Sequence, residues 1–171
     1  NGWEETTTLC LIPAVREATT LPLIAAGGIG TGEAIFALMA LGAEGVQMGT
    51  RFALTDESSA SDIFKEYCLR LNEGDTKLLL KKLAPTRLVT NSFRDRVEAA
   101  EGRGASAEEL RELLGRGRAK KGIFEGDLEE GELEIGQVAA LFRRRQSVDE
   151  VMKELLEGYR RASDKIRSAG L

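Results

Sequence analysis

Two glycine-containing turns are the residues of this chain best suited to chemistry. Gly27 and Gly28 end the apolar stretch LPLIAA, and Gly49 and Thr50 end the stretch GVQM about one βα unit later. A glycine turn lets backbone N–H groups approach a phosphate, because no Cβ holds the oxygens away and a positive φ is tolerated. On neighbouring parallel strands the two turns would converge on one phosphate. The alternative is that these glycines only turn the chain from strand to helix, as is frequent after parallel strands.

Other phosphate motifs do not fit these turns. A dinucleotide fingerprint counted from Gly28 and Gly30 needs a third glycine where the chain has Glu33, and no P-loop pattern is present. Gln47 is a polar amide within GVQMG, and if it is buried it needs a hydrogen-bond partner that a ligand could supply. Arg51 fits two roles equally, as a charge partner of the phosphate or as the partner of an acidic side chain.

Several kinds of chemistry are excluded by composition. The chain has no histidine, so it lacks the commonest general base and metal ligand. Cys10 and Cys68 fit neither a metal spacing nor a disulfide framework, and their apolar neighbours predict that both are small core residues. We therefore predict no metal site.

The charge balance and hydropathy limit the partners. With 24 Lys and Arg against 28 Asp and Glu, the net charge of -4 does not give the basic surface that nucleic acids require. No apolar run reaches the ~20 residues that span a bilayer, and no secretory signal pattern is present. These features predict a cytoplasmic protein that binds neither nucleic acid nor a membrane.

The elements that must position the turns alternate between helix and strand. A helix beginning between Thr8 and Pro13, with Pro13 near its first turn, precedes the strand LPLIAA, which is apolar enough to be covered on both faces. Thr31 caps the next helix, which Gly42 ends, and a second strand follows at 45–48. The positive end of this helix would add to the field at the phosphate. The alternation predicts parallel strands in an α/β sheet.

The remainder of the chain is mainly helical. A helix capped near Ser59 is predicted to end at Gly74, residues 78–83 have no clear preference, and TRLVTNSF is a short strand or an extended segment. Capping boxes at Ser106 and Ser147 begin helices that run to about residues 114 and 168, and the glycine-rich segment between them predicts a structured loop. The amphipathic helix from Ser147 onward fits either a homodimer surface or docking on the outside of the barrel to which the strands would belong.

The two glycine turns also carry a resemblance. LPLIAAGGIGTGEA followed by LGAEGVQMGTRF resembles the second half of the FMN-binding TIM barrel of the nitronate monooxygenase family, formerly called 2-nitropropane dioxygenases. The flavin-dependent enoyl-acyl-carrier-protein reductases share this barrel. NGWEETTTLCLIPAV is similar to the segment after the sixth strand, and GRAKKGIFEGDLEEGELEIGQVAALF is similar to the family's C-terminal portion. The resemblance covers essentially the whole chain.

The resemblance implies a fold and a cofactor site. The fold class is α/β, with about the last two strands of a (β/α)8 TIM barrel in residues 1–75 and a mainly helical extension that packs on the barrel in residues 76–171. The implied cofactor is FMN. Its phosphate contacts, largely with the backbone, fall on Gly27, Gly28, Gln47, Met48, Gly49 and Thr50. The family's usual catalytic histidine lies in a Gly-Gly-His motif directly before Asn1, so no catalytic residue is expected within the chain.

The activity implied by the resemblance is oxidation of an alkyl nitronate or nitroalkane with O2 to a carbonyl compound and nitrite. The alternatives are reduction of an enoyl thioester with NAD(P)H through FMN, which needs the same anchor, and a non-catalytic phosphate-binding or assembly module. A full barrel has about 250 residues. We therefore expect a C-terminal fragment of a longer enzyme that, by itself, neither binds FMN tightly nor turns over.

Overall fold

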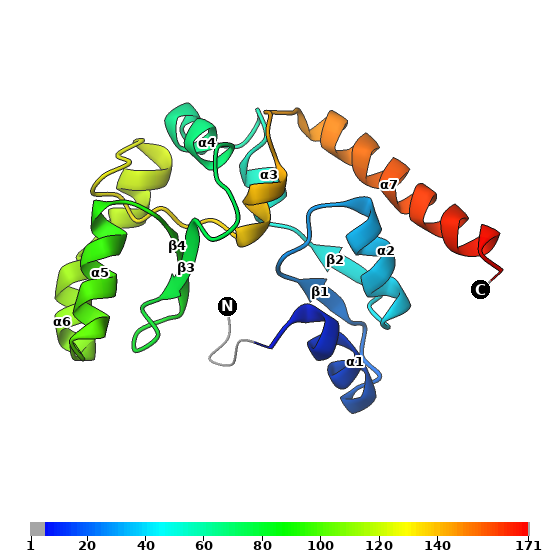
Figure 1. Ribbon diagram of the computed structural model, residues 1–171, viewed down its shortest axis with the longest axis horizontal. Coiled ribbons are helices and arrows are strands. Elements are labelled where there is room, and N and C mark those ends of the chain that lie inside the picture. Colours follow the sequence, from blue (N-terminus) through cyan, green and yellow to red (C-terminus); the bar gives the residue numbers. More distant parts are fainter. Residues whose placement is uncertain (1–5, 171) are drawn as a thin grey trace. The chain divides into compact units, whose positions relative to one another are not determined.

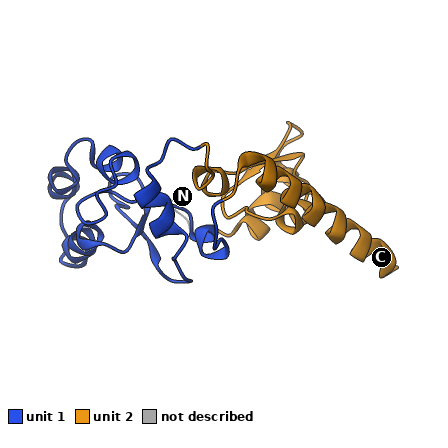
Figure 2. Cartoon of the chain, turned by 90° about the horizontal axis from the view of Figure 1, so that it is seen from above, with its two compact units in different colours: residues 1–5, 58–145 blue, residues 6–57, 146–171 orange. Residues whose placement is uncertain are grey.

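The computed structural model describes residues 6–170, which form two compact units (Figures 1 and 2). Residues 6–57 and the segment from Gln146 onward form the parallel-strand unit, and residues 58–145 form the hairpin unit. The last helix therefore belongs to the same unit as the first two strands. These two units are not the two predicted domains. The prediction that residues 1–75 belong to a barrel and residues 76–171 form an extension of it stays a prediction.

The parallel-strand unit confirms the predicted alternation of helices and strands. Its two strands pair in parallel, with Ala26 opposite Gln47 at their ends. The side chain of Thr31 accepts a hydrogen bond from the N–H of Ala34 at 3.2 Å, and Gly42 has the positive φ (+104°) of a helix stop. The elements are α1 (Thr8–Ala18), β1 (Ile24–Ala26), α2 (Gly32–Ala40), β2 (Gly45–Gln47), α3 (Thr50–Ala53) and α7 (Val148–Ser168).

Three local predictions for this unit were wrong. Pro13 is the sixth residue of α1 rather than a first-turn residue, because the helix already begins at Thr8. Cys10 is exposed, since Ile12 is the α1 residue that enters the core. The strand β1 is covered on one face only: Ala25 is fully buried, whereas Ile24 is 54% exposed.

The C-terminal helix α7 packs along α2 (Figure 1). Its buried face consists of Val151, Leu155 and Gly158, and the rings of Phe36 and Tyr159 meet edge to face at 5.6 Å. The predicted capping box at Ser147 is present. This face of α7 thus packs within the chain itself, whereas docking on the outside of a barrel and a homodimer both stay predictions.

The hairpin unit is built on an antiparallel pair of strands. Thr76 pairs with Val89, and Leu79 pairs with Thr86. The N–H of Val89 also donates to the carbonyl of Leu133, so an extended segment lies along the second strand. The elements of the unit are α4 (Asp62–Cys68), β3 (Thr76–Leu79), β4 (Thr86–Val89), α5 (Ser92–Gly102), α6 (Ala107–Leu114), the π-helix η1 (Lys120–Phe124) and the 3₁₀-helix η2 (Gln137–Leu141).

In the hairpin unit, the predicted ends of one helix are confirmed, whereas those of another helix were wrong. Helix α6 has the predicted capping box and ends at Leu114. The helix predicted from Ser59 begins at Asp62 instead, because Ser61 is the residue whose side chain accepts the N–H of Phe64, and it ends at Cys68, before Gly74. Cys68 is fully buried, as predicted.

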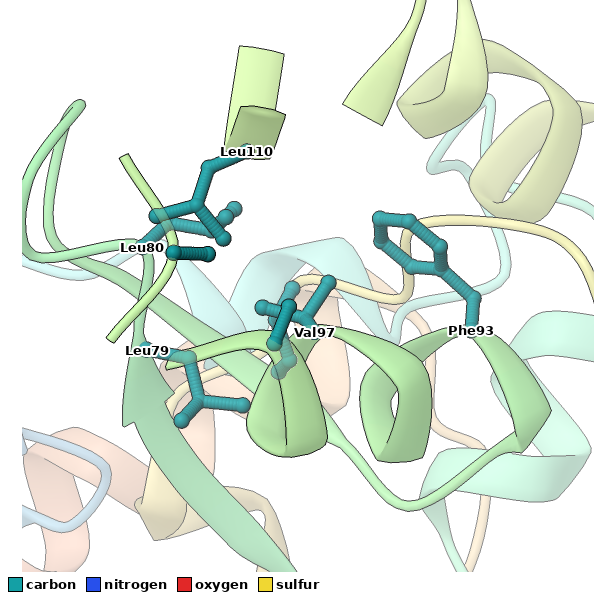
Figure 3. Close-up of a cluster of buried hydrophobic side chains, with 8 residues drawn as sticks. Leu79, Leu80, Phe93, Val97 and Leu110 are labelled. Carbon is teal, nitrogen blue, oxygen red and sulfur yellow. The ribbon is translucent and has the colours of Figure 1, made fainter. Parts of the chain in front are cut away.

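The core of the hairpin unit lies between the hairpin and helices α5 and α6 (Figure 3). Phe93 and Val97 of α5 are fully buried, and Leu110 reaches the same cluster from α6. Leu80, which follows β3, is 1% exposed and has φ of 56°, the left-handed conformation that a branched residue rarely adopts. Burial of the Leu80 side chain offsets the strain of this turn.

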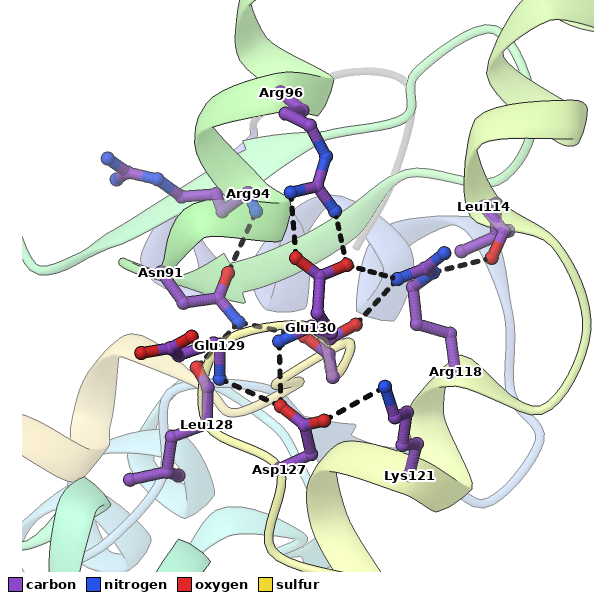
Figure 4. A network of polar contacts seen from close by, with 11 residues as sticks. Asn91, Arg94, Arg96, Leu114, Arg118, Lys121, Asp127, Leu128, Glu129 and Glu130 are labelled. Atoms are coloured by element: carbon purple, nitrogen blue, oxygen red, sulfur yellow. Dashed lines mark hydrogen bonds and ion pairs between the residues drawn. The ribbon is translucent and has the colours of Figure 1, made fainter.

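The predicted structured loop between the helices is confirmed and is held by charged side chains (Figure 4). The carboxylate of Asp127 accepts the N–H groups of Glu130 and Glu129, and these bonds, with Lys121, lower its pKa to about 2. Both carboxylate oxygens of Glu130 pair with Arg96, at 2.8 and 2.6 Å. Arg118 donates to the carbonyl of Glu130, so the loop is tied to elements on both sides of it.

Glu132 gives the hairpin unit a stability that depends on pH. Its side chain is 8% exposed, and within residues 6–170 its carboxylate has no hydrogen-bond or ion-pair partner. Burial and the charge of Glu134 raise the pKa of Glu132 to about 7, although Arg118 acts in the opposite direction. Because the folded state binds the proton more tightly, we expect stability to fall from pH ~4.5 to ~7, by on the order of 3 kcal/mol.

Glu132→Gln tests this expectation, because the amide does not titrate. Urea unfolding of both proteins between pH 4.5 and 8.5 should show that the variant gains stability over wild type as the pH rises. In a control, Glu134→Gln should keep a smaller decline that ends at lower pH, because it removes one of the two causes that raise the pKa of Glu132 and also removes the Glu134 carboxyl, whose own pKa is raised by burial. Parallel stability curves for wild type and Glu132→Gln would contradict the expectation.

Candidate functional site

The parallel pairing of β1 and β2 brings the two predicted turns to one edge of the sheet. Gly27 follows Ala26 directly, and Met48 follows Gln47, which is the partner of Ala26 in the register. Because the strands are parallel, both carboxyl ends lie at the same edge. This edge carries all six residues of the predicted cofactor site.

The first turn has the backbone conformation that the sequence predicted. Gly27 has φ of +97° and Gly28 has φ of +71°, both in the left-handed region that favours glycine. A Cβ added at either residue would meet no other atom within 4 Å. The glycines are therefore required by the turn itself, and the space beside them is open.

The second turn differs from the first in conformation. Gly49 has φ of −96° and ψ of −66°, which any residue can adopt, and a Cβ there would also meet nothing within 4 Å. Here glycine is not required by the backbone. Open space next to both turns is what a phosphate group held by backbone N–H groups needs, so the residues present fit the phosphate end of FMN.

The side chains of Gln47 and Met48 lie in different environments. Gln47 is exposed, so the argument from a buried amide does not apply to this chain. Met48 is partly buried and packs on the cluster that contains Ile12 and Ala25. Its side chain thus stabilises the unit, and any contact with a ligand would use its backbone.

The structure decides between the two roles left open for Arg51. The residue is 6% exposed, and its guanidinium donates to the carboxylate of Glu154 at 2.7 Å and to the side-chain oxygen of Gln146 at 2.9 Å. Arg51 is therefore the partner of an acidic side chain. Sequence reasoning missed Gln146 and Glu154, because they lie about a hundred residues away and no local pattern marks them.

The contribution of the N-terminal end of α2 to the field at the phosphate stays a prediction. Glu33 occupies its first turn, and a bond from its own N–H and the nearby Arg161 guanidinium lower the pKa of this carboxyl. The backbone of α7 packs directly on Gly32. This end of the helix is thus engaged by Glu33 and α7, which leaves the glycine turns as the candidate anion site.

The described part of the chain contains no metal centre, and its buried cysteine is not a reactive thiol. Burial raises the pKa of the Cys68 thiol to about 12, so it is not a thiolate at neutral pH. Among residues 6–170 no three potential ligands of the types His, Cys, Asp and Glu come together. No helix among these residues is long and apolar enough to cross a membrane. The arrangement is suited to holding a cofactor.

Comparisons with known proteins agree on one family. The sequence profile described as nitronate monooxygenase matches residues 1–158. A probable nitronate monooxygenase of Staphylococcus aureus (strain JH9) is 39% identical over 98 residues, which are 56% of this chain and 27% of the relative. The chain thus spans about a quarter of the length of the curated relatives that it matches.

Solved structures also share the fold. FabK from Thermotoga maritima has a TM-score of 0.89 and 33% identity, covering 97% of this chain and 53% of that protein. Nitroalkane oxidase from Streptomyces ansochromogenes has a TM-score of 0.75 and 29% identity, covering 93% of this chain and 45% of that protein.

Proposed function

Because the chain belongs to the nitronate monooxygenase family, we propose that it is the part of a flavoenzyme that holds the phosphate of FMN, and that the whole enzyme oxidises alkyl nitronates or nitroalkanes with O2 to carbonyl compounds and nitrite. The observation that carries the proposal is the convergence of two open glycine turns at one edge of a parallel strand pair.

The residues of the proposed site contribute to phosphate binding mainly through their backbone. Gly27 and Gly28 turn the chain with positive φ so that their backbone faces the phosphate without a Cβ in the way. Gly49 and Thr50 present the second turn, while the backbone of Gln47 and Met48 leads into it. FMN, when bound, supplies the redox chemistry of the reaction. The chain's own contribution is to fix the cofactor's position.

The fold proposed for the whole enzyme is a TIM barrel. In such barrels, phosphate sites commonly lie in the loops after the seventh and eighth strands, the positions that we assign to the turns after β1 and β2. The histidine base that the resemblance implies for neutral nitroalkanes is a residue type that these 171 residues do not contain. By itself, the 171-residue chain is proposed to retain no flavin on purification, and flavin absorbance that stays with it would contradict this. A cytoplasmic location and a homodimer are also proposals.

Reduction of enoyl thioesters is the second candidate, because the same glycine turns also resemble those of the flavin-dependent enoyl-acyl-carrier-protein reductases. The TM-score with FabK (0.89) is higher than the TM-score with the nitroalkane oxidase (0.75). Similarity of fold therefore does not favour nitronate oxidation over other reactions. Both reactions need the same phosphate anchor, and these residues would serve either one.

Two assays on the full-length gene product separate the candidates. Nitrite release from propyl-2-nitronate in air should be fast if the enzyme is a monooxygenase, with little oxidation of NAD(P)H in the presence of crotonyl thioester. The reverse pattern would replace nitronate oxidation by enoyl reduction. Neither activity, together with no bound flavin, would favour the third possibility, a non-catalytic phosphate-binding module.

A further inference from the structure

A buried arginine joins the second glycine turn to the C-terminal helix. Arg51 follows Thr50 directly, and its Nη2 donates both to Glu154 Oε2 at 2.7 Å and to Gln146 Oε1 at 2.9 Å. The amide Nε2 of Gln146 donates to the same Glu154 oxygen at 2.8 Å. Three side chains therefore form a closed triangle of hydrogen bonds, with the arginine 6% exposed at its inner corner.

Backbone contacts fix the far end of the same segment. The N–H of Asp56 donates to the carbonyl of Gln146 at 3.0 Å, and the N–H of Val148 donates to the Glu57 carboxylate at 3.0 and 2.9 Å. Both ends of the segment from Arg51 to Glu57 are thus held by residues 146–154. A four-residue helix such as α3 is not stable by itself, so its position depends on such contacts.

We propose that Arg51, Gln146 and Glu154 are positioning residues that set the Gly49–Thr50 turn for the phosphate of FMN. This inference rests on the proposed function of the turn. The charge of Arg51 is paired with a carboxylate, so its effect on the phosphate comes from placing the turn and not from direct attraction. Backbone donors bind an anion well only when the turn is held in one geometry.

The test compares FMN with riboflavin, which lacks the phosphate. Dissociation constants for both flavins are measured by fluorescence quenching on the full-length gene product, for wild type and for Arg51→Met, which keeps much of the apolar stem. We expect wild type to prefer FMN. The variant should lose about tenfold in FMN affinity, which is about the net contribution of one ordinary hydrogen bond, while its riboflavin affinity stays the same. If the variant were only less well folded, its binding of FMN and of riboflavin would weaken by the same factor.

Two further variants keep the result decisive. Glu154→Gln retains hydrogen-bonding groups but removes the charge. It should show the same selective loss of FMN affinity to a smaller extent. If Arg51→Met does not fold, Glu154→Gln provides the test instead. Arg161→Gln is the matched control, because Arg161 also joins α7 to the unit through a carboxylate, that of Glu33, on the exposed side of α2. Its ratio of FMN to riboflavin affinity should equal that of wild type.

The outcomes separate the two levels of the proposal. If wild type binds FMN and riboflavin equally, the turns do not hold the phosphate and the proposed anchor fails. If wild type prefers FMN but Arg51→Met and Glu154→Gln keep the full preference, the anchor stands and the positioning role is overturned. A selective loss in these variants, with Arg161→Gln unchanged, supports the role.

Discussion

Replacing Gly32 with alanine is expected to destabilise the parallel-strand unit by about 3 kcal/mol, the upper part of the range for overpacked cores. A Cβ at Gly32 would lie 2.1 Å from the carbonyl oxygen of Leu155 and 2.2 Å from the nitrogen of Tyr159. Both are backbone atoms of α7, so no side-chain rotation relieves the overlap. The helix has to move away from α2, which exposes Val151 and Leu155, two residues now buried between the helices.

Gly158→Ala is the matched control, because it adds the same methyl group at the same helix crossing. The atoms nearest to its Cβ would be the carboxylate oxygens of Glu33, at 2.9 and 3.1 Å, which form the far end of an exposed side chain rather than backbone. Alanine also favours a helix interior by about 1 kcal/mol over glycine. Urea unfolding followed by circular dichroism should therefore show Gly158→Ala at least as stable as wild type.

The comparison tests how α7 is seated. A Gly32→Ala variant as stable as wild type would mean that the two helices do not pack backbone to backbone in solution. A loss of similar size in both variants would mean that the crossing tolerates no added volume at all. Only the expected contrast supports the packing seen in the structure.

Features of the fold that depend on neighbours in the sequence were predictable. The capping boxes at Ser106 and Ser147 need residues three positions apart, and both are present. The parallel strands with glycines at their carboxyl ends could be predicted for the same reason, since each signal lies within a few residues. The family resemblance then connected the two turns to a single cofactor.

Features that depend on distant contacts or on competing local signals were not predictable. Gln146 and Glu154 are partners of Arg51 only because α7 returns to the parallel-strand unit. The strand β3 was missed because the run LLLKKLAP has no glycine or asparagine to mark the turn at Leu80, whose left-handed conformation is stabilised by burial. The start of α4 shifted because several serines precede it, and only the cap contact made by Ser61 distinguishes among them.

Gly49→Ala is expected to lower FMN affinity about 10- to 100-fold in the full-length gene product without changing the stability of the fold. The backbone at Gly49 has φ of −96°, which alanine adopts freely, and its Cβ would meet no protein atom within 4 Å. The methyl group would instead occupy the space that we assign to the phosphate. Loss of one charge-assisted hydrogen bond, about 1.5–3 kcal/mol, corresponds to this change in affinity.

The glycines of the first turn are less suitable for the same experiment. Gly27 and Gly28 have positive φ, so alanine at either position adds strain of about 1–2 kcal/mol even without a ligand. Gly102→Ala is the better control, because Gly102 also has open space around it but lies at the end of α5, in the hairpin unit. It should leave the FMN dissociation constant unchanged, and it should not lower the midpoint of urea unfolding, because alanine favours a helix over glycine.

Measuring both FMN affinity and stability for Gly49→Ala distinguishes a lost ligand contact from a disturbed fold. Weaker FMN binding with an unchanged unfolding midpoint places the phosphate against this turn, because nothing in the protein itself is disturbed by the methyl group. Unchanged FMN binding would show that the phosphate lies elsewhere, even if the enzyme uses a flavin. Since Gly49 is exposed and free of backbone strain, a loss of FMN affinity in its alanine variant would come from the ligand and not from a disturbed backbone.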